Sequence, residues 1–204
     1  LVAARPTLPV VLLGEAAAPL TFDRVMIDNV AAARQITHHL IAAGRTRIGF
    51  VGHESAGLSE TSRQRLAGYQ EGLEEAGLVA DPSLLIATDS ISSAAATAAV
   101  GAVLDAGLRF DALVCRDDLA AVGVLRALHV RGRSIPDDVA VTGWDNLRLS
   151  GSTFPSLTTV APDLTALAAE ALRLVLERID GYDRIGRHQI VPHRIVVRES
   201  APTA

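Results

Sequence analysis

Short apolar runs alternate along the chain with longer segments in which apolar residues recur every three or four positions. The short runs predict buried strands, and the longer segments predict amphipathic helices, most of which a glycine closes. The predicted strands are residues 9–13, 24–27, 47–52, 84–88, 112–115 and 139–143, with a strand-like tail at 189–200. The predicted helices are residues 30–43, 61–76, 92–106, 118–132 and 164–179.

Polar residues mark three of the predicted helix starts. Asn29 stands where it can cap the first helix, and Thr61 with Gln64 has the spacing of a capping box. Asp163 can cap the last helix in the same way. That helix is expected to turn one apolar face towards the core, made by Leu164, Leu167, Ala171, Leu172 and Val175.

The order of these elements predicts an α/β fold. Strands that are apolar throughout and that alternate with helices are typical of a parallel sheet covered on both faces, the doubly wound arrangement. The first two strands lack the helix and strand partners that a complete sheet would need. The sequence therefore predicts that the chain begins within a domain and is a fragment of a longer protein.

Composition restricts the class of protein further. Of the 204 residues, 49% are hydrophobic and 21% are charged, and no apolar run is long enough to span a membrane. The start carries no signal-peptide pattern, and the single cysteine, Cys115, excludes an internal disulfide and fits a reducing cytoplasm. A net charge of -4 with no basic run argues against DNA binding by this chain alone.

Polar residues follow the predicted strands at the edge where ligands collect in open parallel sheets. Carboxylates beside an arginine can bind vicinal hydroxyls or a planar heterocycle, because the acid accepts hydrogen bonds and the guanidinium donates them. The alternatives are an internal Asp–Arg pair, or acids that cap the following helices, and for Asp118 the capping role is favoured. The polar residues of this edge are Asp28, residues 53–55, Arg63, Arg65, Asp89, residues 116–118 and residues 144–146.

The sequence carries no motif of an enzyme, metal site or cofactor site. It lacks a G-x-S-x-G elbow, a P-loop, a G-x-G-x-x-G turn and an H-E-x-x-H helix. His38 and His39 are adjacent on one helix and cannot share a metal-binding face. Cys115 ends a buried strand and is interpreted as a core residue. An enzyme is therefore the least favoured class, and no cofactor or metal is expected.

Five segments in order resemble the bacterial lac/gal repressor (LacI/GalR) family. They are "VMIDNVAAARQITHHLIAAGRTRIGFVG", "SRQRLAGYQEGLEEAG", "DDLAAVGVLRALHVRGRSIPDDVAVTGWDN", "PSLTTV" and "HRIVVRES". The resemblance implies a regulatory core of two periplasmic-binding-protein-like lobes joined by three crossover strands, with a small effector between them. It further implies that the helix-turn-helix head and the first part of the N-terminal lobe are absent here. Residues 1–43 and 163–190 would belong to the N-terminal lobe, and residues 44–162 and 191–204 to the C-terminal lobe.

The resemblance also implies the residues of the effector site. Asp145 matches the family's effector-binding acid and Arg65 its effector-binding arginine. Asp117 stands where the family usually has an asparagine, which makes this site more acidic than the usual pattern. The other implied positions are Thr61, which would line the site; Ser90, where many members carry an aromatic residue; and Pro162, near a common polar contact. Trp144 could supply an aromatic face that Ser90 lacks, and it is interpreted as a core anchor or a shield of the cleft floor.

The family pattern further implies partners. The intact regulator would be a cytoplasmic homodimer that binds operator DNA through the absent head, with no membrane partner. Its dimer contact would use the helix at 118–131 and the segment at 147–154, through Val122, Leu125, Leu149 and Phe154. The alternative is a solute-binding protein of a transporter with the same fold. The upstream sequence separates the two, because a basic helix-turn-helix supports the regulator and a signal peptide supports the solute-binding protein.

Overall fold

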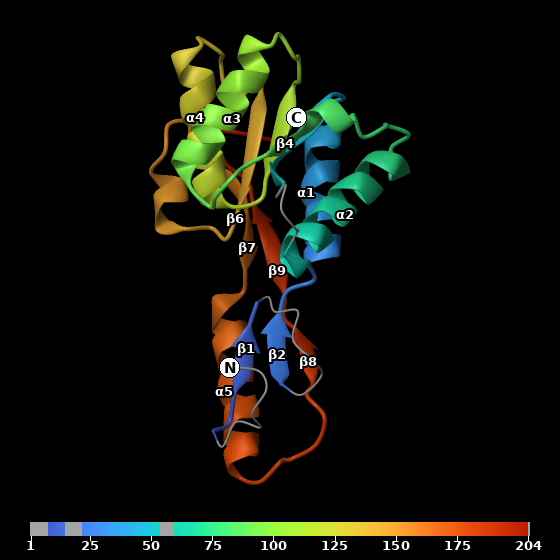
Figure 1. Ribbon diagram of the computed structural model, residues 1–204, viewed down its shortest axis with the longest axis vertical. Coiled ribbons are helices and arrows are strands. Elements are labelled where there is room, and N and C mark those ends of the chain that lie inside the picture. Colours follow the sequence, from blue (N-terminus) through green and yellow to red (C-terminus); the bar gives the residue numbers. More distant parts are fainter. Residues whose placement is uncertain (1–7, 15–21, 54–58, 204) are drawn as a thin grey trace.

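The computed structural model describes residues 8–14, 22–53 and 59–203, which form two β-sheets, one above the other along the long axis of the molecule (Figure 1). The strands are β1 (Val11–Leu13), β2 (Asp23–Met26), β3 (Ile48–His53), β4 (Leu85–Ala87), β5 (Ala112–Cys115), β6 (Ala140–Trp144), β7 (Thr158–Pro162), β8 (His188–Ile190) and β9 (His193–Val196). The α-helices are α1 (Asn29–Ala42), α2 (Glu60–Glu75), α3 (Ser93–Asp105), α4 (Asp118–Val130) and α5 (Leu164–Ile179), and two short 3-10 helices are η1 (Pro82–Leu84) and η2 (Arg148–Gly151).

The predicted α/β fold with parallel sheets is confirmed. The smaller sheet has the strand order β1-β2-β8 and is parallel throughout. The larger sheet has the order β4-β3-β5-β6-β7-β9, in which only β9 runs antiparallel, against β7. The chain crosses between the sheets after β2, after β7 and after β8. These three crossings join the two halves of the molecule.

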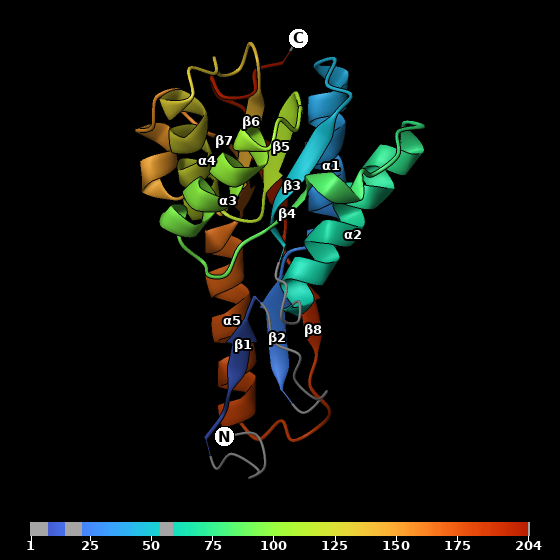
Figure 2. The ribbon, with the colours of Figure 1, turned by 45° about the horizontal axis from the view of Figure 1, so that its top comes forward.

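The larger sheet is doubly wound, with α1 and α2 on one face and α3 and α4 on the other (Figure 2). Neighbouring residues of a strand point to opposite faces, so each strand serves two cores. In β5, Val114 packs into the core under α1 and α2, whereas Leu113 and Cys115 pack into the core under α3 and α4. The burial of both faces explains why these strands are apolar throughout.

Glycines allow the helices of each pair to approach closely. A Cβ atom at Gly68 of α2 would lie 2.1 Å from the carbonyl oxygen of Val30 in α1. A Cβ atom at Gly123 of α4 would lie 2.2 Å from the carbonyl oxygen of Ser93 in α3. Both distances are far inside van der Waals contact, so each pair packs backbone against backbone. Helix α1 therefore packs on α2 and the larger sheet, although the resemblance places residues up to 43 in the N-terminal lobe.

Three predicted helix caps are wrong by one or two residues. Asp28, rather than Asn29, caps α1 by accepting a hydrogen bond from the backbone N–H of Ala31. Ser59, rather than Thr61, caps α2. Asp117, rather than Asp118, caps α4. Runs such as Asp-Asn and Asp-Asp offer two capping side chains in succession, and the sequence alone does not decide which one has the non-helical backbone.

Helix α5 begins and ends where predicted, with Asp163 as its cap. The inward face is only partly as expected. Leu167, Ala171 and Val175 are partly buried and Leu174 is fully buried, but Leu164 is 65% exposed and Leu172 is 59% exposed. The helix packs on β1 and β2 of the three-stranded sheet. A sheet of three strands covers only a narrow stripe along α5. This explains why Leu164 and Leu172, which lie outside that stripe, stay exposed.

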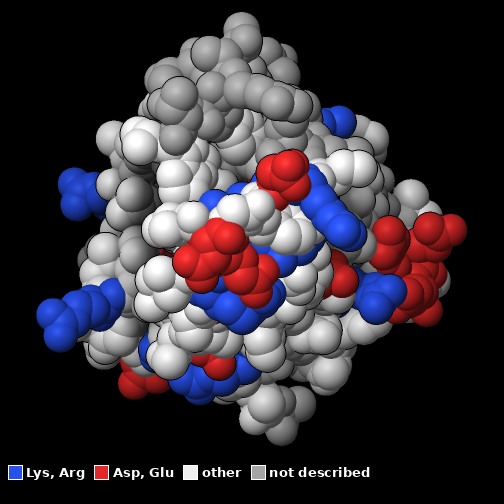
Figure 3. Space-filling view, turned by 90° about the horizontal axis from the view of Figure 1, so that it is seen from below, with Lys and Arg blue, Asp and Glu red and all other residues white. Residues whose placement is uncertain are grey.

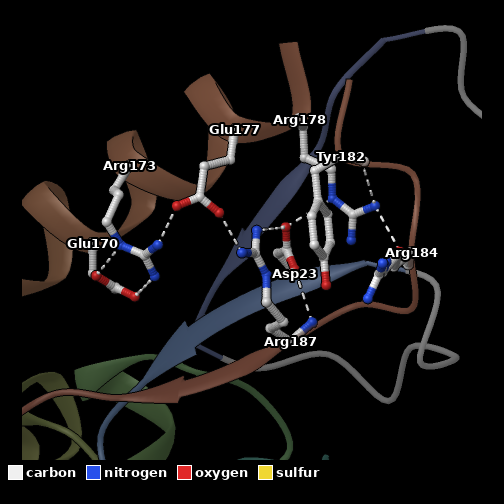
Figure 4. Close-up of polar contacts among 8 residues, drawn as sticks. All are labelled: Asp23, Glu170, Arg173, Glu177, Arg178, Tyr182, Arg184 and Arg187. Carbon is white, nitrogen blue, oxygen red and sulfur yellow. Dashed lines mark hydrogen bonds and ion pairs between the residues drawn. The ribbon is translucent and has the colours of Figure 1, made fainter. Parts of the chain in front are cut away.

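An ion-pair network closes the end of the smaller sheet that faces away from the larger one (Figure 4). Asp23, at the start of β2, is fully buried and accepts hydrogen bonds from Arg178 of α5 and from Arg187 before β8. The ring of Tyr182 lies between these two guanidinium groups, 4.8 Å from one and 4.0 Å from the other. Figure 3, which views the molecule from this end, shows acidic and basic side chains interspersed. We define Asp23, Arg178, Tyr182 and Arg187 as the basal cluster.

Among the described helices, none combines the length and the apolar character that a membrane crossing requires.

Candidate functional site

A cavity of about 480 Å³ lies between the two sheets, at the carboxyl ends of β1, β2, β5, β6 and β7. We call it the central cavity. Carboxyl ends of parallel strands are the expected place for a ligand, because the loops that follow them converge there. Its polar lining residues are Asn29, Ser59, Thr61, Ser62, Arg65, Arg116, Asp117 and Asp145. Its apolar lining residues include Met26, Ile91, Leu119, Trp144, Leu147, Pro162 and Leu164.

Arg65 connects three segments around the central cavity. Its Nε donates to Asn29 Oδ1 at 3.1 Å, at the start of α1, and one terminal nitrogen donates to the carbonyl oxygen of Arg116 at 2.5 Å. Its other terminal nitrogen lies 4.0 Å from Asp145 Oδ1. The guanidinium also lies over the Trp144 ring, 4.1 Å from its centre, which is a cation–π contact. Arg65 is thus held rigidly while it faces the cavity.

Asp145 follows β6 directly and sits in a backbone conformation that is unusual for a residue with a side chain. Its φ is +96°, and the φ of Asn146 is +52°. Such angles store strain and occur preferentially at functional sites. The backbone N–H of Asp145 donates to the carbonyl oxygen of Val160 at 2.9 Å, which fixes the start of the turn to β7. The turn directs the carboxylate into the central cavity instead of continuing the strand.

The electrostatic surroundings of Asp145 favour its neutral form. Burial raises the pKa of the Asp145 carboxyl above its ordinary value, and the nearby charges of Asp118 and Asp117 raise it further. The charge of Arg65 opposes these effects and lowers the pKa. A ligand that donates hydrogen bonds to Asp145 would add to the stabilisation that Arg65 provides for the ionised form.

Trp144 is 1% exposed and belongs to the core beneath α1, yet one side of it borders the central cavity. Arg65 covers one face of the indole, so that face is not open to a ligand ring. The indole N–H finds no hydrogen-bond acceptor among the described residues. Trp144 therefore supports Arg65 and the cavity floor from below.

Asp117 and Asp118 are adjacent in sequence but have different surroundings. Asp117 lines the central cavity; its Oδ1 accepts from the backbone N–H of Ala120 at 2.7 Å and its Oδ2 from Arg116 Nε at 3.1 Å. It is thus a helix cap and an internal ion-pair partner as well as a lining residue. Asp118 is fully buried behind the cavity wall and accepts from Thr159 and from the backbone of Leu147.

The structure brings six of the seven candidate site residues to the central cavity, namely Arg65, Asp145, Asp117, Thr61, Trp144 and Pro162. Ser90 is not among the described lining residues. It is exposed and pairs with Ser92, while the next residue, Ile91, reaches the cavity.

Other polar residues predicted for this edge lie elsewhere. Asp28 caps α1, Arg63 forms an exposed ion pair with Glu60, and Asp89 is not among the described lining residues. Residues 54 and 55 lie outside the described part of the chain. Asn29 is the functional candidate that sequence reasoning missed, because it was interpreted as a helix cap. Its position two residues after the end of the strand predicted at 24–27 is the available signal.

In the described parts of the chain, no three His, Cys, Asp or Glu side chains come together in a way that could hold a metal ion. Burial raises the pKa of the Cys115 thiol well above its ordinary value, and the charges of Asp117 and Asp118 add to this effect. A fully buried thiol with a raised pKa is a poor nucleophile. The chemistry of the central cavity is therefore that of hydrogen-bond donors, acceptors and two kinds of charge.

Comparisons with known proteins agree with this architecture. Residues 37–201 match the family described as periplasmic binding protein-like domain. The HTH-type transcriptional repressor CytR of Escherichia coli (strain K12) is 30% identical over 193 residues, which are 94% of this chain and 55% of CytR. The chain thus spans about half the length of the curated relatives it matches.

Solved structures with similar sequences and folds are also those of transcriptional regulators. A structure of a protein of the LacI family from Sanguibacter keddieii DSM 10542 is 38% identical with a TM-score of 0.89, and the match covers 95% of this chain and 73% of that one. The transcriptional regulator CelR–cellobiose complex is 31% identical with a TM-score of 0.84, covering 93% of this chain and 58% of that one. The chain belongs to the LacI family of transcriptional regulators, and it carries that family's periplasmic binding protein-like domain.

Proposed function

We propose that the chain is the effector-sensing and dimerising core of a DNA-binding transcriptional regulator, and that it binds a small polar ligand in the central cavity. The observation that carries this proposal is the meeting of Arg65, Asp145 and Asp117 around about 480 Å³ between two sheets. Such a site has the groups to bind and orient a ligand, and its described lining residues include no nucleophile paired with a base. The proposed role is therefore binding without catalysis.

The charges of the cavity favour a sugar, a polyol or a nucleoside-like compound. Asp145 would accept hydrogen bonds from neighbouring hydroxyl or N–H groups, and Arg65 would donate to a ligand oxygen. Thr61 would add a hydroxyl that can donate or accept. The complex of CelR with cellobiose supports a ligand rich in hydroxyl groups, since CelR shares 31% of the aligned residues. Ile91, rather than Ser90 or Trp144, offers the apolar contact to a ring.

We further propose the two lobes. The N-terminal lobe comprises the smaller sheet and α5, and its second segment would be residues 163–190. Its first segment ends near residue 28 instead of 43, since α1 packs against α2 and the larger sheet. The C-terminal lobe comprises the larger sheet with α1 to α4 and the tail from 191. The three crossings after β2, β7 and β8 would then act as the hinge.

The proposed homodimer contact uses the segment at 147–154 together with the outer face of α4. Phe154 is 97% exposed and Leu149 is partly exposed, and both lie on or after η2. Val122 is partly buried and Leu125 is buried in the core under α3 and α4, so these two residues contribute less free surface than expected. Phe154 adds to the apolar surface that Leu147 and Leu149 expose on this segment, and a symmetric partner would cover it.

We expect Phe154→Glu to weaken self-association by at least about tenfold, because large aromatic residues dominate interface energies. Sedimentation equilibrium over a range of concentrations measures the change. Val79→Glu is the matched control, since Val79 is also an almost fully exposed apolar residue, in the loop between α2 and η1. Equal dissociation constants for wild type and Phe154→Glu would contradict the proposed contact.

The proposed regulator acts in the cytoplasm and reads operator DNA through a helix-turn-helix head outside this chain. The second candidate, a solute-binding protein of a transporter, shares the fold and the two-lobed cavity. The repressor-like relatives favour the regulator. Determination of the upstream sequence separates the two candidates. A basic helix-turn-helix there would support the regulator, and a signal peptide would support the solute-binding protein.

A thermal-shift screen tests the ligand class. The panel contains sugars including cellobiose, polyols and nucleosides, and a true ligand raises the melting temperature because it binds only the folded chain. We expect at least one compound to stabilise wild type, and to stabilise Arg65→Ala much less. Stabilisation that is equal in both proteins would place the ligand outside the central cavity. A panel without any hit would count against a sugar, polyol or nucleoside as the effector class.

A further inference from the structure

The buried carboxylate of Asp118 holds the turn that separates the central cavity from the proposed dimer surface. Its Oδ2 accepts from the backbone N–H of Leu147 at 2.7 Å and from the hydroxyl of Ser150. Its Oδ1 accepts from Thr159 Oγ1 at 2.7 Å. The side chain is fully buried, so all of its contacts are with the protein. One carboxylate thus ties the start of α4 to β7 and to both ends of the 147–150 segment.

The position of this carboxylate depends on Gly143 in β6. A Cβ atom there would lie 2.3 Å from Asp118 Oδ1, so only glycine leaves room for the acid. Burial raises the pKa of Asp118 above its ordinary value, while the hydrogen bonds from Ser150, Thr159 and Leu147 lower it. A buried carboxylate is unfavourable unless such donors satisfy it. The arrangement is therefore built around the acid.

The turn held in this way has two different ends. Asp145 and Asn146 adopt positive φ angles at one end and direct Asp145 into the central cavity. At the other end η2 leads to Phe154, which is exposed. Backbone hydrogen bonds hold Asp145 to Val160 and Leu157 to Ser150, and the carboxylate of Asp118 adds side-chain bonds between these two points. Residues with positive φ angles persist only where their surroundings hold them in this way.

We propose that Asp118 is a positioning residue that makes the cavity acid and the 147–154 segment one rigid unit. The proposal rests on the proposed function, since it gives that function a physical link between the ligand and the dimer surface. A ligand that moves Asp145 would then move η2 with it, because the segment cannot shift while Asp118 keeps its bonds to Leu147 and Ser150. This link is local and contiguous, and it requires no change in the sheet.

A second contact offers a competing explanation. Arg198, after β9, donates to Asn146 Oδ1 at 2.7 Å and to the carbonyl oxygen of Leu157 at 2.6 Å. If Arg198 alone held the turn, loss of the Asp118 carboxylate would leave the turn in place. The test therefore has to observe both ends of the turn in an Asp118 variant.

Two readouts observe the two ends without any ligand. Trp144 is the only tryptophan of the chain, so acrylamide quenching of its fluorescence reports the cavity floor. Hydrogen–deuterium exchange of the amides in residues 147–154 reports the surface end. In Asp118→Ala we expect about twofold or stronger quenching and about tenfold or faster exchange, because hydrogen bonds to a charged group are lost on both sides. Asp118→Asn should lie closer to wild type, since the Thr159 hydroxyl can rotate to accept from the amide.

Val100→Ala is the control for general destabilisation. Val100 is fully buried in the core between the larger sheet and helices α3 and α4, and it is far from the turn in sequence. Asp118→Ala and Val100→Ala are compared at temperatures equally far below their own melting temperatures. Under these conditions Val100→Ala should leave both readouts at the wild-type level. Thr159→Val should shift both readouts in the wild-type background and shift them clearly less in Asp118→Ala, where the shared bond is already lost and the longer bond from the backbone N–H of Asn146 remains to be removed.

The positioning role would be overturned if a folded Asp118→Ala kept both readouts, if only one of them changed, or if Val100→Ala changed both equally. These outcomes are independent of the effector. A chain that binds no ligand of the screen, but in which Asp118→Ala changes both readouts and Val100→Ala does not, would leave the positioning role standing and would count only against the proposed ligand class.

Discussion

Asp145→Asn is expected to lower effector affinity by about 5- to 150-fold, the equivalent of about 1–3 kcal/mol. The substitution keeps the shape of the side chain but replaces one acceptor by a donor. The new N–H group would face ligand donors and the guanidinium of Arg65, whose terminal nitrogen lies 4.0 Å from the present carboxylate. The fold should survive, since the backbone N–H of Asp145 keeps its bond to Val160.

Calorimetry with the compound identified by thermal shift measures this loss, with Arg65→Ala as the second variant. Because burial raises the pKa of Asp145, the carboxylate gains a proton at a higher pH than a free aspartate would. The affinity of wild type should therefore fall as the pH is lowered towards that raised pKa, and the affinity of Asp145→Asn should not follow it. Wild-type affinity in both variants would make Asp145 a turn-forming residue only.

Asp23→Ala is expected to reduce the free energy of unfolding by about 3–5 kcal/mol, because it leaves buried cations of the basal cluster without their anion. The carboxylate accepts from Arg178 Nε at 2.8 Å, from the backbone N–H of Arg187 at 2.7 Å and from the side chain of Arg187 at 3.1 Å. The two arginines are only 13% and 23% exposed. Their stacking on Tyr182 depends on the same acid.

Denaturant unfolding measures the effect, and Asp105→Ala is its control. Asp105 pairs with Arg131 at 2.7 Å, but this carboxylate is 66% exposed, so we expect a much smaller loss than for Asp23→Ala. The arginine bonds also hold the pKa of Asp23 well below its ordinary value of 3.8. Its contribution is fully present above the unfolded pKa of about 4 and decreases progressively as the pH falls from there towards the lowered pKa of the folded state. Equal midpoints for the two variants would contradict the structural role of the basal cluster.

The sequence predicted the elements of the fold well because their signals are local. The strand at 112–115 and the ends of α5 coincide with the structure, since apolar runs, capping residues and glycines act within a few positions. Long-range pairing carries no such signal. The antiparallel addition of β9 to β7, and the position of β8 in the smaller sheet, depend on strands that are distant in sequence.

The site was predictable to a similar extent. Arg65 and Asp145 follow from the resemblance, and the cavity contains both. The roles of the adjacent acids Asp117 and Asp118 were not predictable, because a shift of one residue in the helix start exchanges the cap with the buried group. A shift of one residue also explains why Ser90 does not line the cavity. The loop after β4 brings its neighbour, Ile91, to the cavity instead.

Because Gly68 has no side chain, α2 packs closely on α1, and this close packing fixes how far Arg65 reaches into the central cavity. Gly68 lies one helical turn after Arg65, and its partner Val30 directly follows Asn29, the residue that binds Arg65 Nε. The contact between the backbones of α1 and α2 therefore sets the distance between the Arg65 guanidinium and the crossing that follows β2. Engineering for a new ligand could vary Thr61 or Ile91 and keep the reach of Arg65 constant. A larger residue at position 68 would change that reach for every ligand at once.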